Sequence, residues 1–576
     1  MFNYRDPRID VKTRIKIIFC LMLSAIVLPL VSLYRLQVVD AEKYTLLSDR
    51  NRIRLSPLLP KRGRIITSDG KTVAGNNSRY RLIADRCSGK ILAENVRLLD
   101  ACINLSEEDK ARIFGSDKNP LIVIKDELSW DEYSRLSMIL FRLNGVSVEI
   151  AYGRDYKMPL EFCHVLGYVS RSGSNVRTPT GKTGIEAVFN AKLSGETGTV
   201  QTEVNAVGKK IRVTDSRDPK DGEDVVLTID SELQKYVCDL LSREKAGACV
   251  VLGIPDGEVL AMVSVPAFDP NLISGRMTRA RWEAVIKDPL FPLMNRAVEC
   301  SYPPGSIFKI IVAFAALSEG IISPNDQIFC SGGVKLDDRV FHCWNRSGHG
   351  RMNLRDALKF SCDCYFFETA KKVGIDRIVK YAKKFGFGSE TGIELPGENA
   401  GLLPSKKWKF LKYGAFWKPY ETMIIGIGQG AILATLLQSA VMMGKLYSGD
   451  YDFSPTLIRG VSKNRAENPV NRECADIIKK ALYRVCTEGT AAGSCHTSYG
   501  ISGKTGSSQV RQIKTGEAGI NSKLIPWKYR DHAFFTGCAP RENPKYVVAV
   551  MIEHGGGGAS AAAPVARQIF DKLMAK

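Results

Sequence analysis

The sequence predicts a multi-domain α+β protein that is held to a membrane by one helix near its amino terminus. Its 576 residues are enough for about three to five domains. Apolar residues make up 44% of the chain and charged residues 25%, which is typical of a globular protein. The 15 cysteines are too sparse for a disulfide-stapled scaffold. This composition excludes a disordered, collagenous or multi-span membrane protein.

The predicted membrane helix lies at residues 17–34, which carry no charge and are bracketed by Lys16 and Arg35. A helix of this length just spans a hydrocarbon core. Pro29 is tolerated in a membrane helix, whereas it would be costly in a soluble one. We therefore expect an uncleaved anchor over residues 17–35.

Two other interpretations of this stretch are a cleaved signal peptide and a lipoprotein signal. No small-residue cleavage site follows it, and the bulky Phe19 stands before Cys20. The basic residues that precede the stretch are Arg5, Arg8, Lys12, Arg14 and Lys16, and those that follow it before residue 51 are Arg35, Lys43 and Arg50. Because the more basic flank stays in the cytoplasm, we expect residues 1–16 to be a cytoplasmic tail and the body to lie outside.

The charge balance indicates a polyanionic neighbour. Lys and Arg number 81 against 61 acidic residues, a net charge of +20. Such an excess is typical of proteins that meet nucleic acid, an acidic membrane surface or an anionic polymer. With the body outside the cytoplasm, we expect no nucleic-acid partner.

The body divides into two modules by the character of its sequence. Residues 36–220 read as short strands, turns and helices with Gly/Asn/Asp punctuation. Residues 221–576 contain longer apolar strands and helices, and the boundary falls in the charged stretch 217–224. The glycine run Gly555–Gly558 is predicted to be a flexible loop.

Ser306 and Lys309 form the first candidate catalytic pair. Pro303, Pro304 and Gly305 precede Ser306, and an apolar stretch follows, which is a helix start signal. Ser306 could simply cap that helix. Alternatively, residues at i and i+3 share a helix face, so the amine of Lys309 could take the proton of the Ser306 hydroxyl and make it a nucleophile.

Single motifs of this kind are weak, but their order in this chain is specific. Other S-x-x-K and K-T-G matches stand at Ser68, Ser242, Lys182 and Lys514, and a P-loop is excluded because Val176 and Ser498 occupy its first glycine position. The order S-x-x-K, S-x-D and K-T-G makes the penicillin-recognising constellation. Here these motifs are Ser306-Ile-Phe-Lys309, Ser361-Cys-Asp363 and Lys504-Thr505-Gly506.

Over nearly its whole length the chain resembles the elongation type of class B penicillin-binding proteins. The motifs that carry the resemblance are RGRIITSDG (62–70), GKTGIEAVFNAKLSGETG (181–198), EVNAVGK (203–209), LTIDSELQ (227–234), GEVLAMVSVPAFDPN (257–271), YPPGSIFK (302–309), GIGQG (426–430), SGKTGSSQ (502–509) and DHAFFTGCAP (531–540). The resemblance implies a non-catalytic stem (pedestal) domain at 36–220 and a penicillin-binding transpeptidase domain at 221–576. It also implies a five-stranded, mostly antiparallel sheet with helices on both faces and Lys504 on an edge strand.

The activity that the resemblance implies is a monofunctional D,D-transpeptidase that cross-links peptidoglycan stem peptides and is inhibited by β-lactams. Ser306 would attack the penultimate D-Ala, Lys309 would act as the base, and Ser361 would relay a proton. Lys504 and Thr505, beside Gly506 and Ser507, would bind the substrate carboxylate. The backbone N–H groups of Ser306 and Ser507 would form the oxyanion hole.

Asp363 raises a question about Lys309. A lysine acts as a base only when it is neutral, and burial and a neighbouring cation such as Lys504 favour that form. An ionised Asp363 nearby would oppose it. We expect either that Asp363 points elsewhere or that another cation or a hydrogen-bond network compensates.

A metal site is the second candidate. Cys330, Cys343, His349 and Cys362 offer the thiolates and imidazole that zinc prefers, with His342 and Cys364 as substitutes. Their spacing is not that of a standard finger, and free or disulfide-paired cysteines explain the pattern equally well. The resemblance favours a structural Zn²⁺, because some elongation-type members carry zinc beside this motif; no cofactor is expected for the chemistry itself.

The remaining candidates have structural interpretations. Cys486 and Cys495 could form a disulfide in an oxidising compartment. We interpret His164, His532 and His554 as structural residues. Arg62, Arg64 and Asp69 are expected to stabilise the stem domain.

Three other functions compete with an elongation enzyme: a division-type (septal) transpeptidase, a β-lactam sensor and a silent scaffold. The Ser361-Cys362-Asp363 motif and the 330–362 Cys/His segment favour the elongation type, and intact motif residues argue against a scaffold. A sensor usually has several membrane spans, whereas this chain has one. The resemblance implies a SEDS-type polytopic glycosyltransferase and elongation-complex proteins as partners at the bacterial inner membrane, with the catalytic body in the periplasm.

Overall fold

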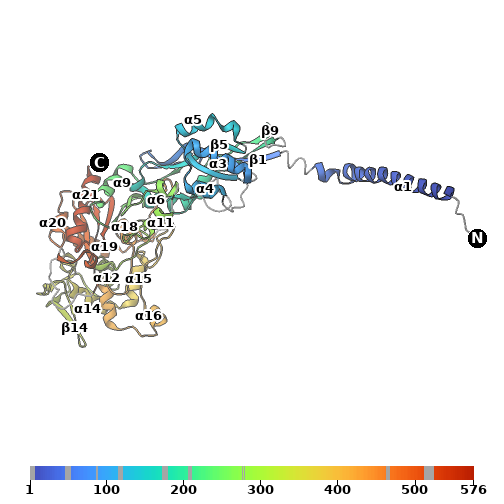
Figure 1. The fold of residues 1–576 in the computed structure, drawn as a ribbon. Helices are drawn as coiled ribbons and strands as arrows, with labels where there is room; N and C mark the ends of the chain where they lie inside the picture. The colour runs from blue at the N-terminus through green and yellow to red at the C-terminus, as the bar shows by residue number, and fades with distance from the viewer. Residues whose placement is uncertain are drawn as a thin grey trace, which may run out of the picture. The chain divides into compact units, whose positions relative to one another are not determined.

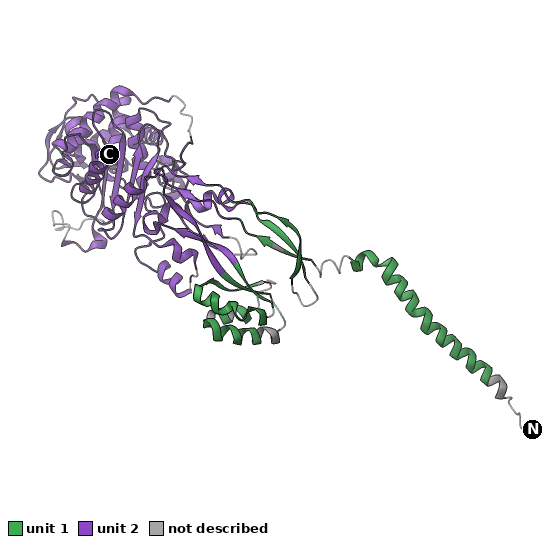
Figure 2. Cartoon of the chain, turned by 90° about the horizontal axis from the view of Figure 1, so that it is seen from above, with its two compact units in different colours: residues 1–60, 81–149, 196–221 green, residues 61–80, 150–195, 222–576 purple. Residues whose placement is uncertain are grey.

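The structure is a computed structural model (Figure 1) that describes residues 7–45, 53–85, 89–114, 121–143, 145–170, 179–204, 210–275, 277, 279–461, 468–511 and 524–575. These residues form two compact units, coloured separately in Figure 2. The first comprises residues 1–60, 81–149 and 196–221, and the second comprises residues 61–80, 150–195 and 222–576. The second unit thus includes two segments of the amino-terminal module, and the predicted division of the sequence at residue 220 stays a prediction.

The first unit begins with helix α1 (Pro7–Tyr34), which continues into the π-helical turn η1 (Arg35–Val39). Residues Val11–Val39 are long and apolar enough to cross a membrane, with a mean hydropathy of 2.5 in their most apolar window and none of that window buried. The expected anchor at 17–35 lies within this helix. Pro29 sits inside α1 without ending it.

The rest of the first unit contains a three-stranded antiparallel sheet in the order β1-β8-β9 and a group of helices. Its elements are β1 (Ile53–Leu58), α3 (Gly89–Ile103), α4 (Glu107–Phe114), β4 (Leu121–Leu128), α5 (Trp130–Ser137), η2 (Leu140–Arg142), β8 (Gly198–Val204) and β9 (Lys210–Arg217). The long strands β3 (Thr72–Asp85) and β5 (Val146–Tyr156) each contribute residues to both units.

The second unit is built on a five-stranded sheet in the order β12-β11-β19-β18-β17. Its strands are β11 (Gly247–Gly253), β12 (Val259–Val265), β17 (Ser502–Ser508), β18 (His532–Ala539) and β19 (Tyr546–Ile552). All four pairings are antiparallel. The expected five-stranded sheet is therefore confirmed, and β17, which carries Lys504, is an edge strand as expected.

Helices cover both faces of this sheet, which explains why its inner strand β11, between β12 and β19, is wholly buried. Successive side chains of a strand point to opposite faces. Val250 accordingly packs in a core with α12 (Lys309–Ser318) and α18 (Leu436–Ser448). Val251 packs in a second core with α9 (Ser231–Leu241) and α21 (Ala563–Met574). A strand buried on both faces needs a continuous apolar run, and β11 (GACVVLG) supplies one.

The second unit contains further elements, of which β2 and β10 belong to another sheet, in the order β10-β2-β3-β4. They are β2 (Ile65–Ile66), α6 (Pro159–Leu166), β6 (Val169–Ser170), β7 (Thr180–Gly181), α7 (Gly184–Val188), α8 (Asn190–Ser194), β10 (Val225–Val226), α10 (Pro270–Ser274), α11 (Arg279–Ile286), η3 (Gly305–Phe308), β13 (Ile328–Cys330), β14 (Gly333–Leu336), β15 (Arg339–His342), β16 (Gly350–Met352), α13 (Leu354–Lys359), α14 (Asp363–Val373), α15 (Ile375–Lys384), α16 (Lys406–Tyr413), α17 (Pro419–Gly426), α19 (Arg472–Thr487), α20 (Ala492–Cys495), η5 (Trp527–Tyr529) and η6 (Gly558–Ala562).

A buried charge cluster lies in the second unit near its first residues. Arg62 and Arg154 both pair with Glu186, which is fully buried, at 2.6 and 2.5 Å. Arg64 pairs with Asp224 at the surface. Asp69 accepts hydrogen bonds from the backbone and side chain of Ser231. Arg62 and Asp69 thus join distant segments of the second unit.

Candidate active site

Ser306 lies in the 3₁₀ turn η3, immediately before the buried helix α12. The predicted helix is present, but Ser306 precedes its α-helical part and does not occupy its first α turn. Every residue of α12 up to Ala316 is buried, and a helix that is apolar all round is a core helix. Gly305 adopts a left-handed φ of 57°, where a Cβ would lie 2.6 Å from the Ser507 carbonyl oxygen. Glycine at 305 therefore lets η3 pack directly against β17.

Lys309 is fully buried. Its amine forms hydrogen bonds with the segment that follows Phe360. Its Nζ donates to the Ser361 carbonyl at 2.8 Å, to Ser361 Oγ at 3.2 Å and to Asp363 Oδ1 at 2.6 Å. An ammonium group has three donors, so these bonds account for all of them. None of the described hydrogen bonds joins Lys309 to the Ser306 hydroxyl.

Asp363 faces Lys309 and does not point elsewhere. Its Oδ1 forms the buried ion pair with Lys309, and its Oδ2 accepts a hydrogen bond from the Trp344 backbone N–H at 2.8 Å. Asp363 is also the first residue of α14, where a negative charge is stabilised by the helix dipole. The arrangement in which Asp363 points elsewhere is therefore not the one in the structure, and the same network contains a second lysine.

That second lysine is Lys504, which extends from the edge strand β17 and is fully buried. Its Nζ donates to Ser361 Oγ at 2.9 Å and to the Thr505 carbonyl at 3.1 Å. Burial, together with the positive charge of Lys309, lowers the pKa of Lys504 well below its usual value. Of the two amines, the site thus favours the neutral form at Lys504.

Ser361 stands between the two lysines. Its hydroxyl oxygen accepts hydrogen bonds from Lys309 and Lys504, which leaves its own proton free to be donated. Its backbone has a positive φ of 55°, a conformation that is uncommon outside glycine and that persists only where surrounding contacts hold it. This residue therefore connects the two amines by a path along which a proton can move.

The rest of the K-T-G strand lies beside the turn that carries Ser306. Thr505 is nearly buried, and its hydroxyl is 2.8 Å from that of Thr490, which follows α19. A Cβ on Gly506 would lie 3.2 Å from the Pro304 carbonyl oxygen. Ser507 is exposed, and its Oγ accepts a hydrogen bond from the Gly558 N–H at 3.3 Å.

Within the glycine run predicted to be a loop, residues 555–557 lie outside helices and strands, whereas Gly558 is tightly packed. Gly558 begins the turn η6 and is buried. A Cβ at this position would lie 2.4 Å from the carbonyl oxygens of Gly506 and Phe534. Close backbone packing and flexibility select the same residue type, so only the tertiary contacts distinguish Gly558 from the glycines before it.

Two residues beside the site carry no motif and were missed by the sequence interpretation. Trp344 bonds Asp363 through its backbone and Ser361 through its indole. Thr490 bonds Thr505. A threonine or a tryptophan outside a motif does not indicate from sequence alone that it contacts a functional site. The position of Trp344 directly after Cys343 was the one available hint.

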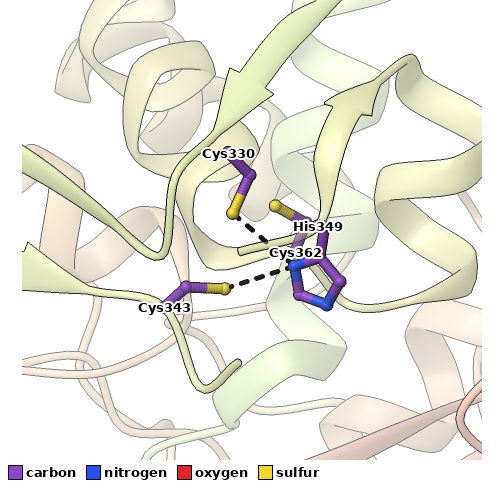
Figure 3. Close-up of side chains that lie close together, drawn as sticks. All are labelled: Cys330, Cys343, His349 and Cys362. Atoms are coloured by element: carbon purple, nitrogen blue, oxygen red, sulfur yellow. Dashed lines mark hydrogen bonds between the residues drawn. The ribbon is translucent and has the colours of Figure 1, made fainter. Parts of the chain in front are cut away.

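The four predicted metal ligands lie together next to this site (Figure 3). Each offers one ligand atom, and these atoms all lie within 4.8 Å of one another. The His349 Nδ1 is 3.6 Å from the Cys330 sulfur and 3.5 Å from the Cys343 sulfur. Cys362 comes from the S-x-D motif itself. The pKa of the Cys343 thiol is lowered by hydrogen bonds with Cys362 and Cys364.

The substitute ligands and the other candidates take different places. Cys364 is buried beside the four ligands, whereas His342 is exposed at the end of β15. Cys486 and Cys495 are buried free thiols. Burial lowers the pKa of both His164 and His532 to about 4, so each is neutral at pH 7. His532 accepts a hydrogen bond from the His554 N–H at 3.0 Å. Lys514 lies outside the described residues.

Comparisons with known proteins identify this arrangement. The family model of the penicillin binding protein transpeptidase domain matches residues 247–573, and that of the penicillin-binding protein dimerisation domain matches residues 57–227. The peptidoglycan D,D-transpeptidase MrdA of Haemophilus influenzae is 34% identical over 94% of this chain and 88% of its own.

Two solved structures also match. The penicillin-binding protein PBP2 of Helicobacter pylori, solved in complex with MreC, has a TM-score of 0.82 at 26% identity and covers 91% of this chain and 99% of its own. A peptidoglycan synthase complex, solved to study the coordination of polymerisation and crosslinking, contains a chain with a TM-score of 0.69 at 28% identity, covering 97% of each chain.

The fold and the three motifs define a serine acyl transferase of the penicillin-binding class. Within that class, the chain belongs to the elongation-type peptidoglycan D,D-transpeptidases, the family of MrdA and PBP2. The two family models together cover residues 57–227 and 247–573.

Proposed function

We propose that Ser306 is the nucleophile of this transpeptidase. Its oxygen attacks the carbonyl carbon of the penultimate D-Ala of a stem peptide, the peptide bond to the terminal D-Ala breaks, and an acyl-enzyme forms. The amine of a neighbouring stem peptide then takes the acyl group and frees Ser306. β-Lactams acylate the same oxygen. The observation that carries this proposal is the buried Lys309–Ser361–Lys504 network next to the turn that holds Ser306.

The proton path follows from the charges in this network. Lys309 must give up a proton before it can accept the one from Ser306. Ser361 Oγ lies within hydrogen-bond distance of both amines, so the proton can pass through it to Lys504, whose neutral form is favoured by burial. An arriving substrate carboxylate favours the charged form of Lys504. Substrate binding thus draws the proton to Lys504 and frees Lys309 as the base.

Substrate is held by the K-T-G strand, in which Ser507 is the one exposed residue of Ser502–Ser508. The carboxylate pairs with charged Lys504 and accepts a hydrogen bond from the Thr505 hydroxyl. The backbone N–H groups of Ser306 and Ser507 donate to the developing oxyanion, an effect worth about 2.7–4 kcal/mol per donor. Packing of η3 on β17 through Gly305 supports this arrangement, because it brings the two backbones together.

Labelling with fluorescent penicillin tests the nucleophile. The wild-type chain is expected to form a stable adduct, and Ser306→Ala is expected to form none. Ser242→Ala is the matched control, because Ser242 belongs to another S-x-x-K sequence and lies at the end of α9, so it should label like wild type. An adduct that persists in Ser306→Ala would remove the proposal.

We infer that Cys330, Cys343, His349 and Cys362 hold a structural zinc ion. Ligand atoms around a tetrahedral zinc ion at about 2.0–2.3 Å lie about 3.5 Å apart, and the two sulfur–Nδ1 separations are 3.5 and 3.6 Å. Three soft sulfurs and one imidazole are the donor set that zinc prefers. The ion would hold the segment that carries Ser361, because Cys362 is the next residue.

Metal analysis of the purified full-length chain tests this inference. We expect about one equivalent of zinc in wild type and about a tenth of that or less in Cys343→Ser. Cys474→Ser, which changes a buried thiol outside the cluster, should keep its zinc. A metal-free wild-type protein, or one in which these cysteines form disulfides, contradicts the inference.

Among the residues that the structure describes, one helix is suited to anchoring the chain in a membrane. We propose that this membrane is the bacterial inner membrane, that the amino terminus is cytoplasmic and that the second unit is periplasmic. We also propose that the chain works with elongation-complex proteins and with a separate SEDS-type glycosyltransferase. The complexes of related proteins with MreC and in a peptidoglycan synthase support this. Co-purification from membranes tests it, and consistent recovery of the chain without either partner would argue against it.

A further inference from the structure

Trp344 lies between the Cys/His cluster and the lysine network. It directly follows Cys343, and its side chain is 60% exposed. Its indole N–H donates to the carbonyl oxygens of Phe360 and Ser361, each at 3.1 Å. Its backbone N–H donates to Asp363 Oδ2 at 2.8 Å. Trp344 thus forms hydrogen bonds on both sides of Cys362, the middle residue of the S-x-D motif.

Trp344 forms hydrogen bonds with the same two residues that bind the Lys309 amine, Ser361 and Asp363. The Ser361 carbonyl accepts from Lys309 at 2.8 Å and from the Trp344 indole at 3.1 Å. Asp363 accepts from Lys309 through Oδ1 and from the Trp344 backbone through Oδ2. Moreover, Ser361 has a positive φ, and a strained residue keeps its conformation only through contacts of this kind.

Burial does not explain tryptophan at this position. Most of the ring surface faces solvent, so the hydrophobic gain of the ring is small. The ring meets His349 edge-on, with centroids 5.3 Å apart, so the indole also contacts the Cys/His cluster. A residue with this shape but without an N–H would lose only the bonds to the 360–361 carbonyls.

We propose that Trp344 is a positioning residue for the transpeptidase: its indole N–H holds Ser361 in the orientation in which the Ser361 hydroxyl bridges Lys309 and Lys504. Because Trp344 contacts both, the position of the Cys/His cluster determines the position of the lysine network. The proposal rests on the roles proposed above for Ser361 and Lys309. Trp344 acts through Ser361, so it changes the rate of acylation and not the initial binding of the ligand.

The test measures acylation of the full-length chain by benzylpenicillin, separating the binding constant of the first complex from the acylation rate. Trp344→Phe keeps a ring and removes the N–H. We expect the acylation rate to fall about tenfold, the range of one or two lost hydrogen bonds, with the binding constant unchanged. Trp417→Phe is the matched control, because the Trp417 indole N–H donates to Thr422 Oγ1 at 2.8 Å elsewhere in the unit, and it should leave both constants unchanged.

Replacing Trp344 with 3-benzothienylalanine, which has sulfur in place of the N–H, decides the case if Trp344→Phe unfolds. The same loss of rate in that protein supports the proposal, and a wild-type rate overturns it. Weaker binding with a wild-type acylation rate also overturns it, because the ring would then be a ligand contact. Mass spectrometry locates the adduct: an adduct away from Ser306 refutes the proposed nucleophile, independently of the Trp344 result.

Discussion

Asp363 supplies one negative charge to a buried site that contains two lysines. It lies 2.6 Å from the Lys309 amine, and removing one partner of such a buried pair typically costs about 3–5 kcal/mol. Lys504 has no carboxylate among its hydrogen-bond partners and donates to Ser361 and Thr505. With one carboxylate and two amines, the network can pass one proton between Lys309 and Lys504 through Ser361. The proposed serine nucleophile needs a base of this kind.

Thr490 is predicted to orient the residue that binds substrate. Thr490→Val removes the 2.8 Å bond to the Thr505 hydroxyl, and one hydrogen bond of this kind is worth about 0.5–1.5 kcal/mol. We expect the binding constant for benzylpenicillin to weaken about two- to tenfold, since Thr505 is then free to rotate away from the carboxylate. Stopped-flow acylation kinetics measure this. Thr490→Ser keeps the hydroxyl and should bind like wild type; equal loss in both variants would show that shape matters and not the bond.

At the scale of elements, the site depends on how closely three segments approach one another. The edge strand β17 packs between η3 on one side and η6 on the other, and both contacts occur where a glycine leaves no room for a side chain. β17 pairs only with β18 among the strands of its sheet, so the contacts with η3 and η6 add packing to this edge strand. The strand that carries the K-T-G motif is thereby held without a second strand beside it.

Gly558→Ala is predicted to disturb this packing. Its Cβ would lie 2.4 Å from two backbone carbonyl oxygens, which must shift to accommodate it. Overpacking of this kind typically costs about 1–3 kcal/mol. We expect a lower melting temperature and slower penicillin acylation, measured by thermal unfolding and by labelling. Gly493→Ala is the control, because nothing lies within 4 Å of its added Cβ. If both alanine variants behave alike, the packing argument is wrong.

At the scale of the whole molecule, one helix connects a large catalytic body to the membrane. Helix α1 carries its basic residues at its amino-terminal end, before the apolar stretch. Basic flanks are retained in the cytoplasm, and this sets the side of the membrane on which the rest of the chain resides. We therefore propose that the rest of the chain lies on the outer side, where an enzyme that acts on the cell wall meets its substrate.

Reporter fusions test this orientation. Alkaline phosphatase, which is active only outside the cytoplasm, should be active when fused after Lys576. Green fluorescent protein at the same position should be dark when the chain is exported by the Sec route. Replacing Lys12, Arg14 and Lys16 with glutamate should lower the phosphatase activity, because the charge bias is lost. A fluorescent fusion to the wild-type chain contradicts the proposed orientation.

The family, the membrane helix and the identity of the motif residues could be predicted from the sequence. Motif spacing and apolar runs are local properties that can be read directly from the amino-acid sequence. The expectation of an edge strand carrying Lys504 is confirmed for the same reason, since it depends on a family pattern that the motifs identify. The gathering of Cys330, Cys343, His349 and Cys362 was suggested by residue type, whereas their spacing alone did not decide it.

Only the tertiary structure decided which partners these residues have. The sequence could not tell whether Asp363 faces Lys309, that the Ser361 hydroxyl joins two amines, or that Trp344 and Thr490 contact the site. Each of these contacts joins segments far apart in the chain or depends on a side-chain direction. Linear patterns determine which residues are chemically able to act; the charges and hydrogen bonds that make them act arise from distances that exist only once the chain is folded.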